Sequence, residues 1–348
     1  MKIHEREIDE NNYPFIIGEL SANHGGQIDR AKRSIKEAAK TGISAVKIQT
    51  YTPDTMTINC NKPDFFVSDG IWAGRTLYEL YSEAFTPFEW HEELFDYAKK
   101  IGIKLFSTPF DETAVDLLET LNAPAYKIAS FEITDLQLIR YIAKTHKPMF
   151  ISTGMASETE IEQAVKTIRQ STDADILLFH CISSYPTATK DANLNNIKWL
   201  KNKFGVQVGL SDHTTDNISA LTAIGLGAVA IEKHFKLDNE DCGPDSTFSL
   251  TTTELKKLVD ECNLAWEARG KQGLNRAEAE KQNMVFRRSL YFVNDLTAGD
   301  KITQNDIKRI RPGYGIEPKY YDEIIGKVLK KDAARGEPVS FEHFQIKK

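Results

Sequence analysis

Two lysines lie within strongly apolar segments of the sequence, Lys47 within residues 46–48 and Lys127 within residues 126–128. A buried ammonium group is costly unless an anion meets it. These lysines therefore predict a site that binds an anionic substrate, with Ser and Thr hydroxyls from neighbouring segments completing it. The alternative interpretation is structural: each lysine lies at the end of a strand and reaches a loop carboxylate.

A second group of residues has the composition of a metal site. His213 and His234 lie at the ends of two consecutive apolar segments, and Glu19 ends an earlier one. Two imidazoles with a carboxylate and water suit a borderline divalent ion such as Mn²⁺, Zn²⁺ or Fe²⁺, although each histidine taken singly is also compatible with a structural role. We expect Mn²⁺, with Mg²⁺ or Co²⁺ as alternatives. Four other histidines belong to no such group and are expected at the surface: His4, His91, His146 and His343.

Anion-binding lysines beside a metal are compatible with phosphate transfer, an enolate-forming aldol reaction or metal-dependent hydrolysis. The sequence has no P-loop of the form GxxxxGK[ST], which argues against a nucleotide motor. A Schiff-base aldolase needs one lysine with a depressed pKa. Two lysines among hydroxyls are more typical of clamps for carboxylate and phosphate groups.

Apolar runs separated by helix signals must position these residues. Asp111 precedes one predicted helix, and Ser157 with Glu160 has the capping-box spacing at the start of another. The runs are nearly continuous in apolar residues, which is typical of parallel strands buried on both faces. They cover residues 15–20, 45–50, 104–108, 125–130, 149–154, 176–181, 207–212 and 228–235.

Strand–helix units of this number in about 270 residues predict a (β/α)₈ TIM barrel, whose active site lies at the C-terminal ends of the strands. A doubly wound open sheet is the structural alternative, because strand order is not visible in a sequence. No Gly-rich dinucleotide turn follows the first strand, which favours the barrel.

The pattern of apolar runs stops near residue 270, which ends the predicted barrel domain, 1–270. Residues 271–283 are polar and charged and are interpreted as a linker. Short β-like pieces with turn signals follow in residues 284–348 and predict a small, mostly β domain. A domain of about 65 residues buries little core, so we expect it to pack on another surface.

Composition excludes several classes of protein. The 348-residue chain has a net charge of −6, which argues against nonspecific nucleic-acid binding. Its longest apolar run, residues 223–231, is far shorter than the ~18 residues of a membrane span. The polar N-terminal segment lacks the apolar stretch of a signal peptide. The four cysteines form no CxxC pair and are typical of reduced thiols, so a cytoplasmic protein is expected.

At the predicted strand ends the chain resembles the sialic acid synthase family, over nearly its whole length. The matching segments are residues 18–25, 46–50, 106–111, 127–132, 152–155, 184–186, 209–213, 231–235 and 243–245. The tail, with Arg288, Ser289 and residues 311–315, resembles the family's antifreeze-like (SAF) domain. Residues 72–78 and 86–91 are similar to the pseudaminic acid synthase branch, although Trp72 and Trp90 are also compatible with simple packing of a long loop.

The resemblance implies a transferase that condenses phosphoenolpyruvate with 2,4-diacetamido-2,4,6-trideoxy-L-altrose. The products are pseudaminic acid and phosphate, and the phosphate leaves by C–O cleavage. Synthesis of N-acetylneuraminic or legionaminic acid is the alternative within the family. A metal-dependent barrel hydrolase is a more distant alternative, and a non-catalytic saccharide-binding or ice-binding protein is an alternative of another class.

The resemblance also assigns the site residues. Phosphoenolpyruvate would be held by Lys47, Thr108, Lys127, Ser130, Ser152, Ser183 and Ser211. At Ser183 some members of the family carry an amide. The catalytic group would be Glu19 with the metal ligands His213 and His234, and Glu19 would handle protons or support a metal-bound water. The sugar would be bound by Asn23, Gln49, Glu132, Tyr185, Asp245 and Arg311. Arg311 would reach the sugar from the partner chain of a domain-swapped homodimer.

Overall fold

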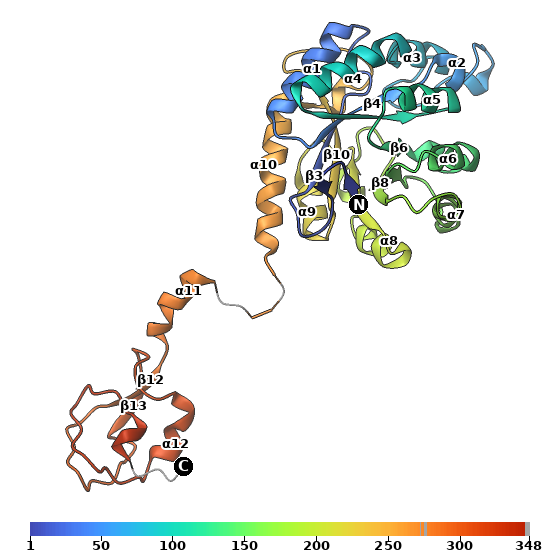
Figure 1. Cartoon of the computed structure of the whole chain (residues 1–348). Helices are drawn as coiled ribbons and strands as arrows, with labels where there is room; N and C mark the ends of the chain where they lie inside the picture. Colours follow the sequence, from blue (N-terminus) through green and yellow to red (C-terminus); the bar gives the residue numbers. More distant parts are fainter. Residues whose placement is uncertain (272, 275–276, 345–348) are drawn as a thin grey trace. The chain divides into compact units, whose positions relative to one another are not determined.

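The computed structural model of the chain describes residues 1–271, 273–274 and 277–344. Contacts between residues divide the chain into two compact units, Met1–Gly270 and Lys271–Lys348 (Figure 1). Residues 272 and 275–276, which belong to the predicted linker, and residues 345–348 of the predicted tail domain lie outside the described residues.

Parallel strands in sequential order form the centre of the first unit. They are β3 (Phe15–Glu19), β4 (Ala45–Thr50), β5 (Lys104–Pro109), β6 (Tyr126–Ile128), β7 (Met149–Ser152), β8 (Ile176–Cys181), β9 (Gln207–Asp212) and β10 (Ala230–Lys236). Strand β10 pairs with both β9 and β3, so the sheet closes on itself. The predicted TIM barrel is confirmed, and the open sheet was the wrong alternative.

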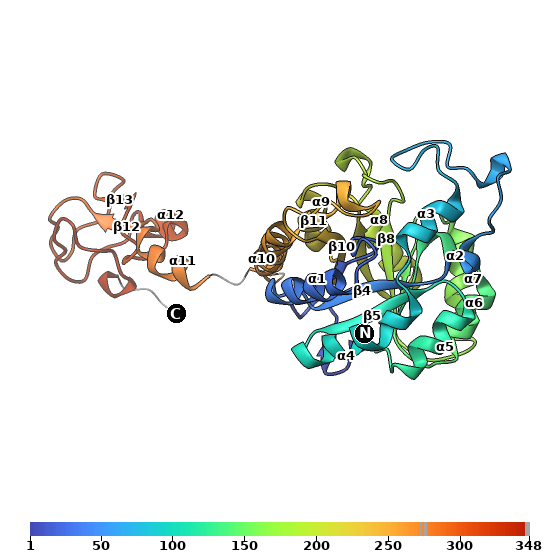
Figure 2. The same cartoon turned by 90° about the horizontal axis from the view of Figure 1, so that it is seen from above.

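Helices surround these strands in both views of the ribbon (Figures 1 and 2). They are α1 (Ile28–Lys40), α4 (His91–Ile101), α5 (Glu112–Thr120), α6 (Leu136–Ala143), α7 (Glu158–Arg169), α8 (Asn196–Phe204), α9 (Ile218–Gly225) and α10 (Thr252–Arg269). The predicted helix starts are confirmed where a side chain caps the backbone. Asp111 accepts hydrogen bonds from the first amides of α5, and Ser157 with Glu160 forms a capping box on α7.

Short elements fill the longer connections of the barrel. The β4–α4 connection contains α2 (Pro53–Met56), η1 (Pro63–Phe65), α3 (Leu77–Ala84) and η2 (Phe88–Trp90). Other connections contain η3 (Ser130–Glu132), η4 (Thr189–Asp191), η5 (Ser246–Phe248) and β11 (Leu250–Thr251), of which β11 extends β10 by a parallel pairing. An N-terminal hairpin of β1 (Lys2–Ile3) and β2 (Arg6–Glu7) precedes the barrel.

The interior of the barrel is apolar at the N-terminal ends of the strands. Phe150 stacks with Phe15, Phe106 and Phe179 at ring-centroid distances of 6.1, 5.3 and 5.6 Å. A Cβ at Gly209 would lie 2.6 Å from the Phe179 ring, so the strand approaches that ring closely only because the residue is glycine. Ile3 and Ile8, from the hairpin, join this cluster.

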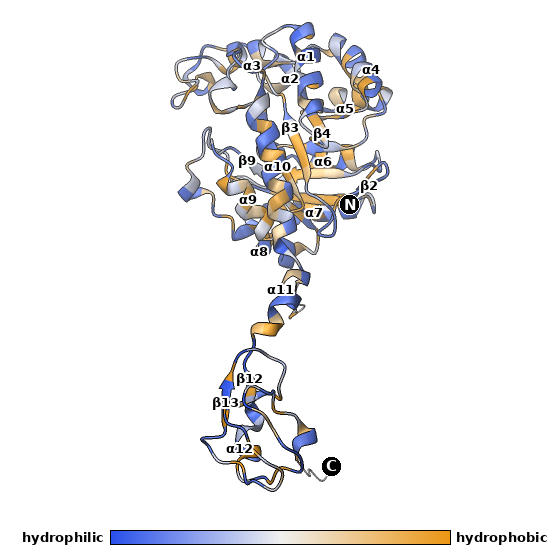
Figure 3. Ribbon diagram, turned by 90° about the vertical axis from the view of Figure 1, so that its left-hand side faces the viewer, coloured by the Kyte–Doolittle hydropathy of each residue, from blue (hydrophilic) through white to orange (hydrophobic). Residues whose placement is uncertain are grey.

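A second and larger apolar core lies between the strands and the helices. Figure 3 shows the barrel strands largely in orange and the surrounding helices with mixed faces. Because side chains alternate along a strand, the same strands supply one set of residues to this outer core and another to the barrel interior. Among the described residues, none of the helices is both long enough and apolar enough to cross a bilayer. Each of the four cysteines is free, as the sequence predicts.

The second unit contains short elements around its own core. They are α11 (Glu278–Asn283), η6 (Met284–Phe286), β12 (Ser289–Phe292), β13 (Ile307–Ile310), η7 (Pro318–Tyr320), α12 (Tyr321–Ile324) and η8 (Phe341–His343). Strands β12 and β13 pair antiparallel, and Leu290 and Phe292 of β12 lie in the core with Val339. Regular strand structure is thus shorter than the sequence predicts, and α11 lies within the predicted linker.

Candidate active site

Polar side chains from every barrel strand or from the connection directly after it line a cavity at the C-terminal ends of the strands. Most of the predicted site residues lie there: Glu19, Lys47, Gln49, Thr108, Lys127, Ser130, Ser152, Tyr185, Ser211, His213 and His234. The cavity is also lined by Ala129, Cys181 and Glu232, which the sequence analysis did not include. Alternation explains the gathering, because inward positions that hold phenylalanine or alanine early in a strand hold polar groups two residues later.

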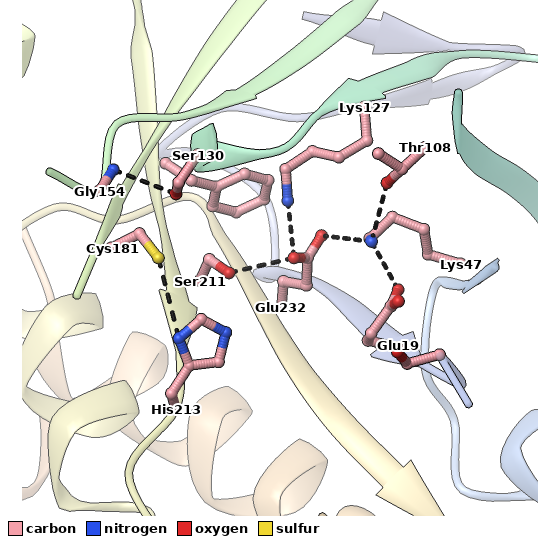
Figure 4. A network of polar contacts seen from close by, with 12 residues as sticks. Glu19, Lys47, Thr108, Lys127, Ser130, Gly154, Cys181, Ser211, His213 and Glu232 are labelled. Atoms are coloured by element: carbon pink, nitrogen blue, oxygen red, sulfur yellow. Dashed lines mark hydrogen bonds and ion pairs between the residues drawn. The ribbon is translucent and has the colours of Figure 1, made fainter. Parts of the chain in front are cut away.

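The two lysines approach the same carboxylate, Glu232, in this cavity (Figure 4). Lys47 Nζ lies 2.6 Å from Glu19 Oε2 and 3.9 Å from Glu232 Oε2, and it donates to Thr108 Oγ1 at 3.0 Å. Lys127 Nζ donates to Glu232 Oε1 at 2.6 Å. The partners are strand residues inside the barrel rather than loop carboxylates, so the lysines do not reach outward as the structural interpretation required.

Burial and charge act in opposite directions on these four groups. Burial alone would raise the pKa of Glu232, but the ammonium groups of Lys127 and Lys47 outweigh it and lower that pKa to about 2. Burial raises the pKa of Glu19 despite its contact with Lys47. Burial also lowers the pKa of Lys127, whereas the two carboxylates near Lys47 outweigh burial and raise its pKa. Glu232 is therefore the firmly ionised carboxylate of the group.

Glu232 is the charged residue of the cavity to which the sequence analysis assigned no role. It lies two residues before His234 on β10, so the two side chains share the inward face of that strand. The same spacing relates Lys47 to Gln49. Strict period-2 alternation counted back from His234 is the signal that identifies it.

A cluster of hydroxyls lies beside Lys127. Ser130 Oγ accepts a hydrogen bond from the Gly154 amide at 3.2 Å, and the buried Ser152 Oγ has no partner. A Cβ on Gly154 would lie 2.3 Å from Ser183 Oγ and 2.7 Å from Ser130 Oγ, so glycine is what allows both serines to approach. Ser183 is half-buried next to this cluster and is not among the residues that line the cavity.

The predicted metal ligands face each other across the cavity, with ring centroids 5.5 Å apart. His213 Nδ1 lies 2.9 Å from the Ile182 carbonyl, to which it donates, so Nε2 is the ring nitrogen left for a ligand. His234 Nδ1 is buried without a hydrogen-bond partner and lies 3.8 Å from Asp245 Oδ2. Burial, together with the neighbouring His213, holds the pKa of His234 well below its usual value.

These features fit a divalent metal with two protein nitrogens. A neutral imidazole whose buried nitrogen makes no hydrogen bond can donate the lone pair of that nitrogen to a metal ion. Within the part of the chain that the structure describes, no group of three or more His, Cys, Asp or Glu side chains is arranged as a complete metal site. The remaining coordination positions would therefore be filled by oxygen atoms of water or substrate.

Aromatic rings pack together next to the histidines, and of these rings Tyr185 lines the cavity. Tyr185 lies 4.3 Å from the His213 ring, 5.7 Å from Trp72 and 5.3 Å from Phe248, measured between ring centroids. Trp72 Nε1 donates to the Pro244 carbonyl at 3.0 Å. Phe248 was not predicted, because it lies in η5, where no strand or helix periodicity indicates a direction. Trp90, in contrast, lies 5.4 Å from the ring of the buried His24 and packs against the outer core.

Three of the predicted sugar ligands in the barrel do not line the cavity. Asn23 Nδ2 donates to the Phe235 carbonyl and to Ser249 Oγ, both at 2.8 Å, while its buried Oδ1 has no partner. Asp245 Oδ2 accepts from Ser21 Oγ at 2.5 Å. Glu132 lies in η3, and burial raises its pKa to about 7. By contrast, Gln49 lines the cavity and donates to Glu19 Oε1 at 3.0 Å.

Arg311 belongs to the second unit, where it is exposed. Its assignment to the sugar site stays a prediction.

Two histidines expected at the surface are buried, and that prediction was wrong for them. His91 begins α4, and its ring is within hydrogen-bond distance of Thr50 Oγ1 (2.8 Å) and the Pro87 carbonyl (3.0 Å). His343 Nε2 lies 3.0 Å from Glu337 Oε1. In both histidines, oxygen atoms of the protein lie within hydrogen-bond distance of the ring nitrogens, so the ring can be buried without binding a ligand.

Acid should destabilise the barrel through two buried histidines. Burial lowers the pKa of His24 and that of His91 to about 4 each, against about 6.5 in an unfolded chain. The unfolded state therefore binds more protons between pH 6.5 and 4, and stability falls as pH falls through this window. Between pH 7.5 and 5, each histidine should cost about 2 kcal/mol of unfolding free energy.

Urea unfolding followed by circular dichroism at both pH values measures this loss. His91→Gln should show a smaller drop between pH 7.5 and 5 than the unaltered protein. His146→Gln is the control, because His146 is exposed and should leave the pH dependence unchanged. Equal drops in His91→Gln and in the unaltered protein would show that His91 does not supply this term.

Comparison with known proteins gives matches over nearly the whole chain. The NeuB family model matches residues 34–273, and the SAF domain model matches residues 287–345. Pseudaminic acid synthase of Campylobacter jejuni is 44% identical over 331 residues, covering 95% of this chain and 96% of that protein. Pseudaminic acid synthase of Helicobacter pylori is 42% identical, covering 94% and 96%.

A solved structure agrees with these matches. The N-acetylneuraminic acid synthetase of Leptospira borgpetersenii, solved in complex with citrate, superposes with a TM-score of 0.71 at 32% identity and covers 79% of this chain and 91% of its own. The family model covers more than half of the chain, and all but the last three residues of its match belong to the unit that forms the closed barrel. The chain belongs to the NeuB family and carries the SAF domain at its C-terminal end.

Proposed function

We propose that the protein condenses phosphoenolpyruvate with 2,4-diacetamido-2,4,6-trideoxy-L-altrose to give pseudaminic acid and phosphate. The observation that carries this is the convergence of two buried ammonium groups, Lys47 and Lys127, in a cavity that also holds two imidazoles. The similarity to pseudaminic acid synthases supports the choice of sugar. We place the reaction in the cytoplasm, where the free thiols stay reduced.

Phosphoenolpyruvate would lie against the lysines. Its carboxylate and phosphate are matched by the two ammonium groups, and the hydroxyls around them fix its orientation, so that its C3 faces the sugar. The hydroxyls are those of Thr108, Ser130, Ser152 and Ser211, with Ser183 beside them. Ser152 Oγ is free to donate, because it has no partner among the residues that the structure describes.

A divalent metal, proposed as Mn²⁺, would be held by His213 and His234. When bound, it supplies Lewis-acid polarisation of the open-chain aldehyde oxygen. Asp245 Oδ2 lies 3.8 Å from His234 Nδ1, too far for a hydrogen bond, so this nitrogen would be left for the metal.

Carbon–carbon bond formation joins C3 of phosphoenolpyruvate to the sugar aldehyde carbon. Water then adds at C2, and phosphate leaves as the C–O bond breaks, so that one water is consumed for each phosphate released. We assign proton handling to Glu19, whose pKa burial raises and whose carboxylate accepts from Gln49. A carboxylate with a raised pKa accepts a proton more readily than an ordinary glutamate does.

The sugar preference would follow from the aromatic group around Tyr185. Tyr185 lines the cavity, and the rings of Trp72 and Phe248 pack against it at 5.7 and 5.3 Å between ring centroids. Such an apolar surface suits a deoxygenated carbon and the methyl groups of two acetamido substituents. We expect the 2,4-diacetamido-2,4,6-trideoxy sugar to be turned over at least about tenfold faster than N-acetylmannosamine, since one buried apolar group contributes roughly 1–3 kcal/mol to discrimination.

Phosphate release from phosphoenolpyruvate with each sugar measures this preference. Phe248→Ala should reduce the ratio between the two sugars, whereas Phe204→Ala, on the outer face of the barrel, should leave the ratio unchanged. Faster turnover of N-acetylmannosamine by the unaltered protein would assign the chain to sialic acid synthesis. Absence of phosphate release with any amino sugar would favour the non-catalytic saccharide-binding alternative.

The assembly is proposed to be a domain-swapped homodimer in which Arg311 reaches the sugar site of the partner chain. In the second unit, a hollow close in sequence to Arg311 is lined by residues from the ranges 284–288 and 313–319. They include charged side chains and the exposed Tyr314. Such a surface is suited to cover a polar cavity. Covering the mouth of the barrel would exclude water from the reaction.

Subunit complementation tests this arrangement. Arg311→Ala and Lys47→Ala chains, each nearly inactive, are mixed under conditions that exchange subunits. If sites are shared, one of the two sites in each mixed dimer carries neither substitution, and about half of the normal activity per mixed dimer should return. A mixture of Lys47→Ala and Lys127→Ala chains is the matched control and should remain inactive, because both substitutions lie in the barrel. A fully active monomer would exclude the shared site.

A further inference from the structure

Glu232 is the charged group in the cavity for which the proposed reaction has no use. Its side chain is buried, and its Oε1 accepts hydrogen bonds from Lys127 Nζ at 2.6 Å and from Ser211 Oγ at 3.0 Å. Its Oε2 faces Lys47 Nζ at 3.9 Å. A carboxylate of the protein therefore already contacts three of the groups that phosphoenolpyruvate would use (Figure 4).

The formal charges of the cavity cancel. Two ammonium groups, Lys47 and Lys127, face two carboxylates, Glu19 and Glu232, within 4 Å. Glu232 lies within 4 Å of both ammonium groups, whereas Glu19 contacts Lys47, so Glu232 is the carboxylate that opposes both lysines. A phosphoenolpyruvate anion entering this cavity gains little from the lysines, because it must share them with Glu232 and is repelled by it.

A resident anion also has a benefit in the substrate-free protein. An ammonium group buried without a partner is strongly destabilising, and Glu232 supplies that partner for Lys127. The lysine can then remain charged and fixed in place until a substrate arrives. Glu232 is thus a positioning residue that acts through the lysines.

A divalent cation at the histidine pair changes this balance. His234 lies on the same strand face as Glu232, two residues further on, and its buried Nδ1 has no hydrogen-bond partner among the residues that the structure describes. A cation there would make the cavity net positive and give Glu232 an alternative attraction. We propose that Glu232 couples the two ligands, so that phosphoenolpyruvate binds tightly only together with the divalent cation. This coupling rests on the proposed function, which supplies the identity of both ligands.

Calorimetric titration of phosphoenolpyruvate into the chelator-treated protein, with and without added Mn²⁺, measures the coupling directly and needs no turnover. In the unaltered protein Mn²⁺ should tighten phosphoenolpyruvate binding by at least about tenfold, within the range typical of coupled sites. Glu232→Gln keeps the shape and the acceptor for Ser211 but removes the charge. This variant should bind phosphoenolpyruvate more tightly than the unaltered protein when Mn²⁺ is absent. The ratio of its phosphoenolpyruvate affinities with and without Mn²⁺ should fall towards one.

Glu119→Gln is the matched control. Glu119 pairs with Lys147 at 2.7 Å outside the cavity, so the variant removes the same charge from the chain and should keep the full ratio. If Mn²⁺ tightens phosphoenolpyruvate binding in Glu232→Gln as much as in the unaltered protein, the proposal is overturned. If that variant does not fold, titration of Mn²⁺ into the unaltered protein decides, because linkage requires phosphoenolpyruvate to tighten Mn²⁺ by the same factor.

Equal Mn²⁺ affinity of the unaltered protein with and without phosphoenolpyruvate would also overturn the coupling. Absence of phosphoenolpyruvate binding even with Mn²⁺ would contradict the proposed function itself, and the coupling with it. The two failures are therefore distinguishable in one set of titrations.

Discussion

Lys47→Ala and Lys127→Ala should each weaken phosphoenolpyruvate binding by a factor of about 30 or more. Deleting one member of a desolvated charge pair typically costs ~2–5 kcal/mol, and about 1.4 kcal/mol corresponds to a tenfold change in affinity. Both ammonium groups are buried in the same cavity, so water cannot replace them as partners of the phosphate and carboxylate. Saturation curves for phosphoenolpyruvate in the presence of Mn²⁺ measure the effect.

Lys147→Ala is the control for this pair of variants. Lys147 also contacts a glutamate, Glu119, but it lies outside the cavity and should leave phosphoenolpyruvate saturation unchanged. Circular dichroism and thermal unfolding must show that the two site variants fold, because each leaves a buried carboxylate with one partner fewer. Near-normal saturation in both folded variants would mean that the lysines are structural.

Removal of the divalent metal should abolish turnover. His213 and His234 supply two protein nitrogens, so His234→Ala should lower the affinity for Mn²⁺ by at least about 10- to 100-fold, since substitutions of groups that merely orient a ligand already cost that much. Free Mn²⁺ measured by electron paramagnetic resonance during titration gives the affinity. Phosphate release before and after treatment with EDTA gives the dependence of turnover on the metal.

His146→Ala is the matched control for the metal, because His146 is exposed and distant in sequence from both ligands. Readdition of Mn²⁺ should restore the chelated protein but not His234→Ala. Unchanged turnover after chelation, or full turnover in folded His234→Ala, would contradict a metal-assisted reaction.

Strand periodicity explains why so much of the site is predictable. Glu19, Lys47 and Lys127 lie on short apolar strands with a fixed alternation, so their inward direction follows from their neighbours in sequence. The closure of the barrel then brings together residues that are more than a hundred positions apart. The number and spacing of the strands were sufficient to predict that closure.

Loops explain most of the rest. Phe248 and Glu132 lie in 3₁₀ turns, where one residue's direction depends on tertiary contacts that no periodicity encodes. Asn23 was predicted as a sugar ligand from the family resemblance, and its amide nitrogen donates to a backbone carbonyl and to Ser249. His91 was misplaced for a similar reason, since the acceptors that make its burial possible come from Thr50 and Pro87, in a strand end and a turn.

The phenylalanine layer below the cavity has a consequence for the order of events. Phe15, Phe106, Phe150 and Phe179, with Ile3 and Ile8 from the hairpin, fill the other end of the barrel in the part of the chain that the structure describes. Substrates and products would therefore pass through the opposite end, at the C-terminal ends of the strands. If the lysines hold phosphoenolpyruvate as proposed, we expect it to bind before the sugar.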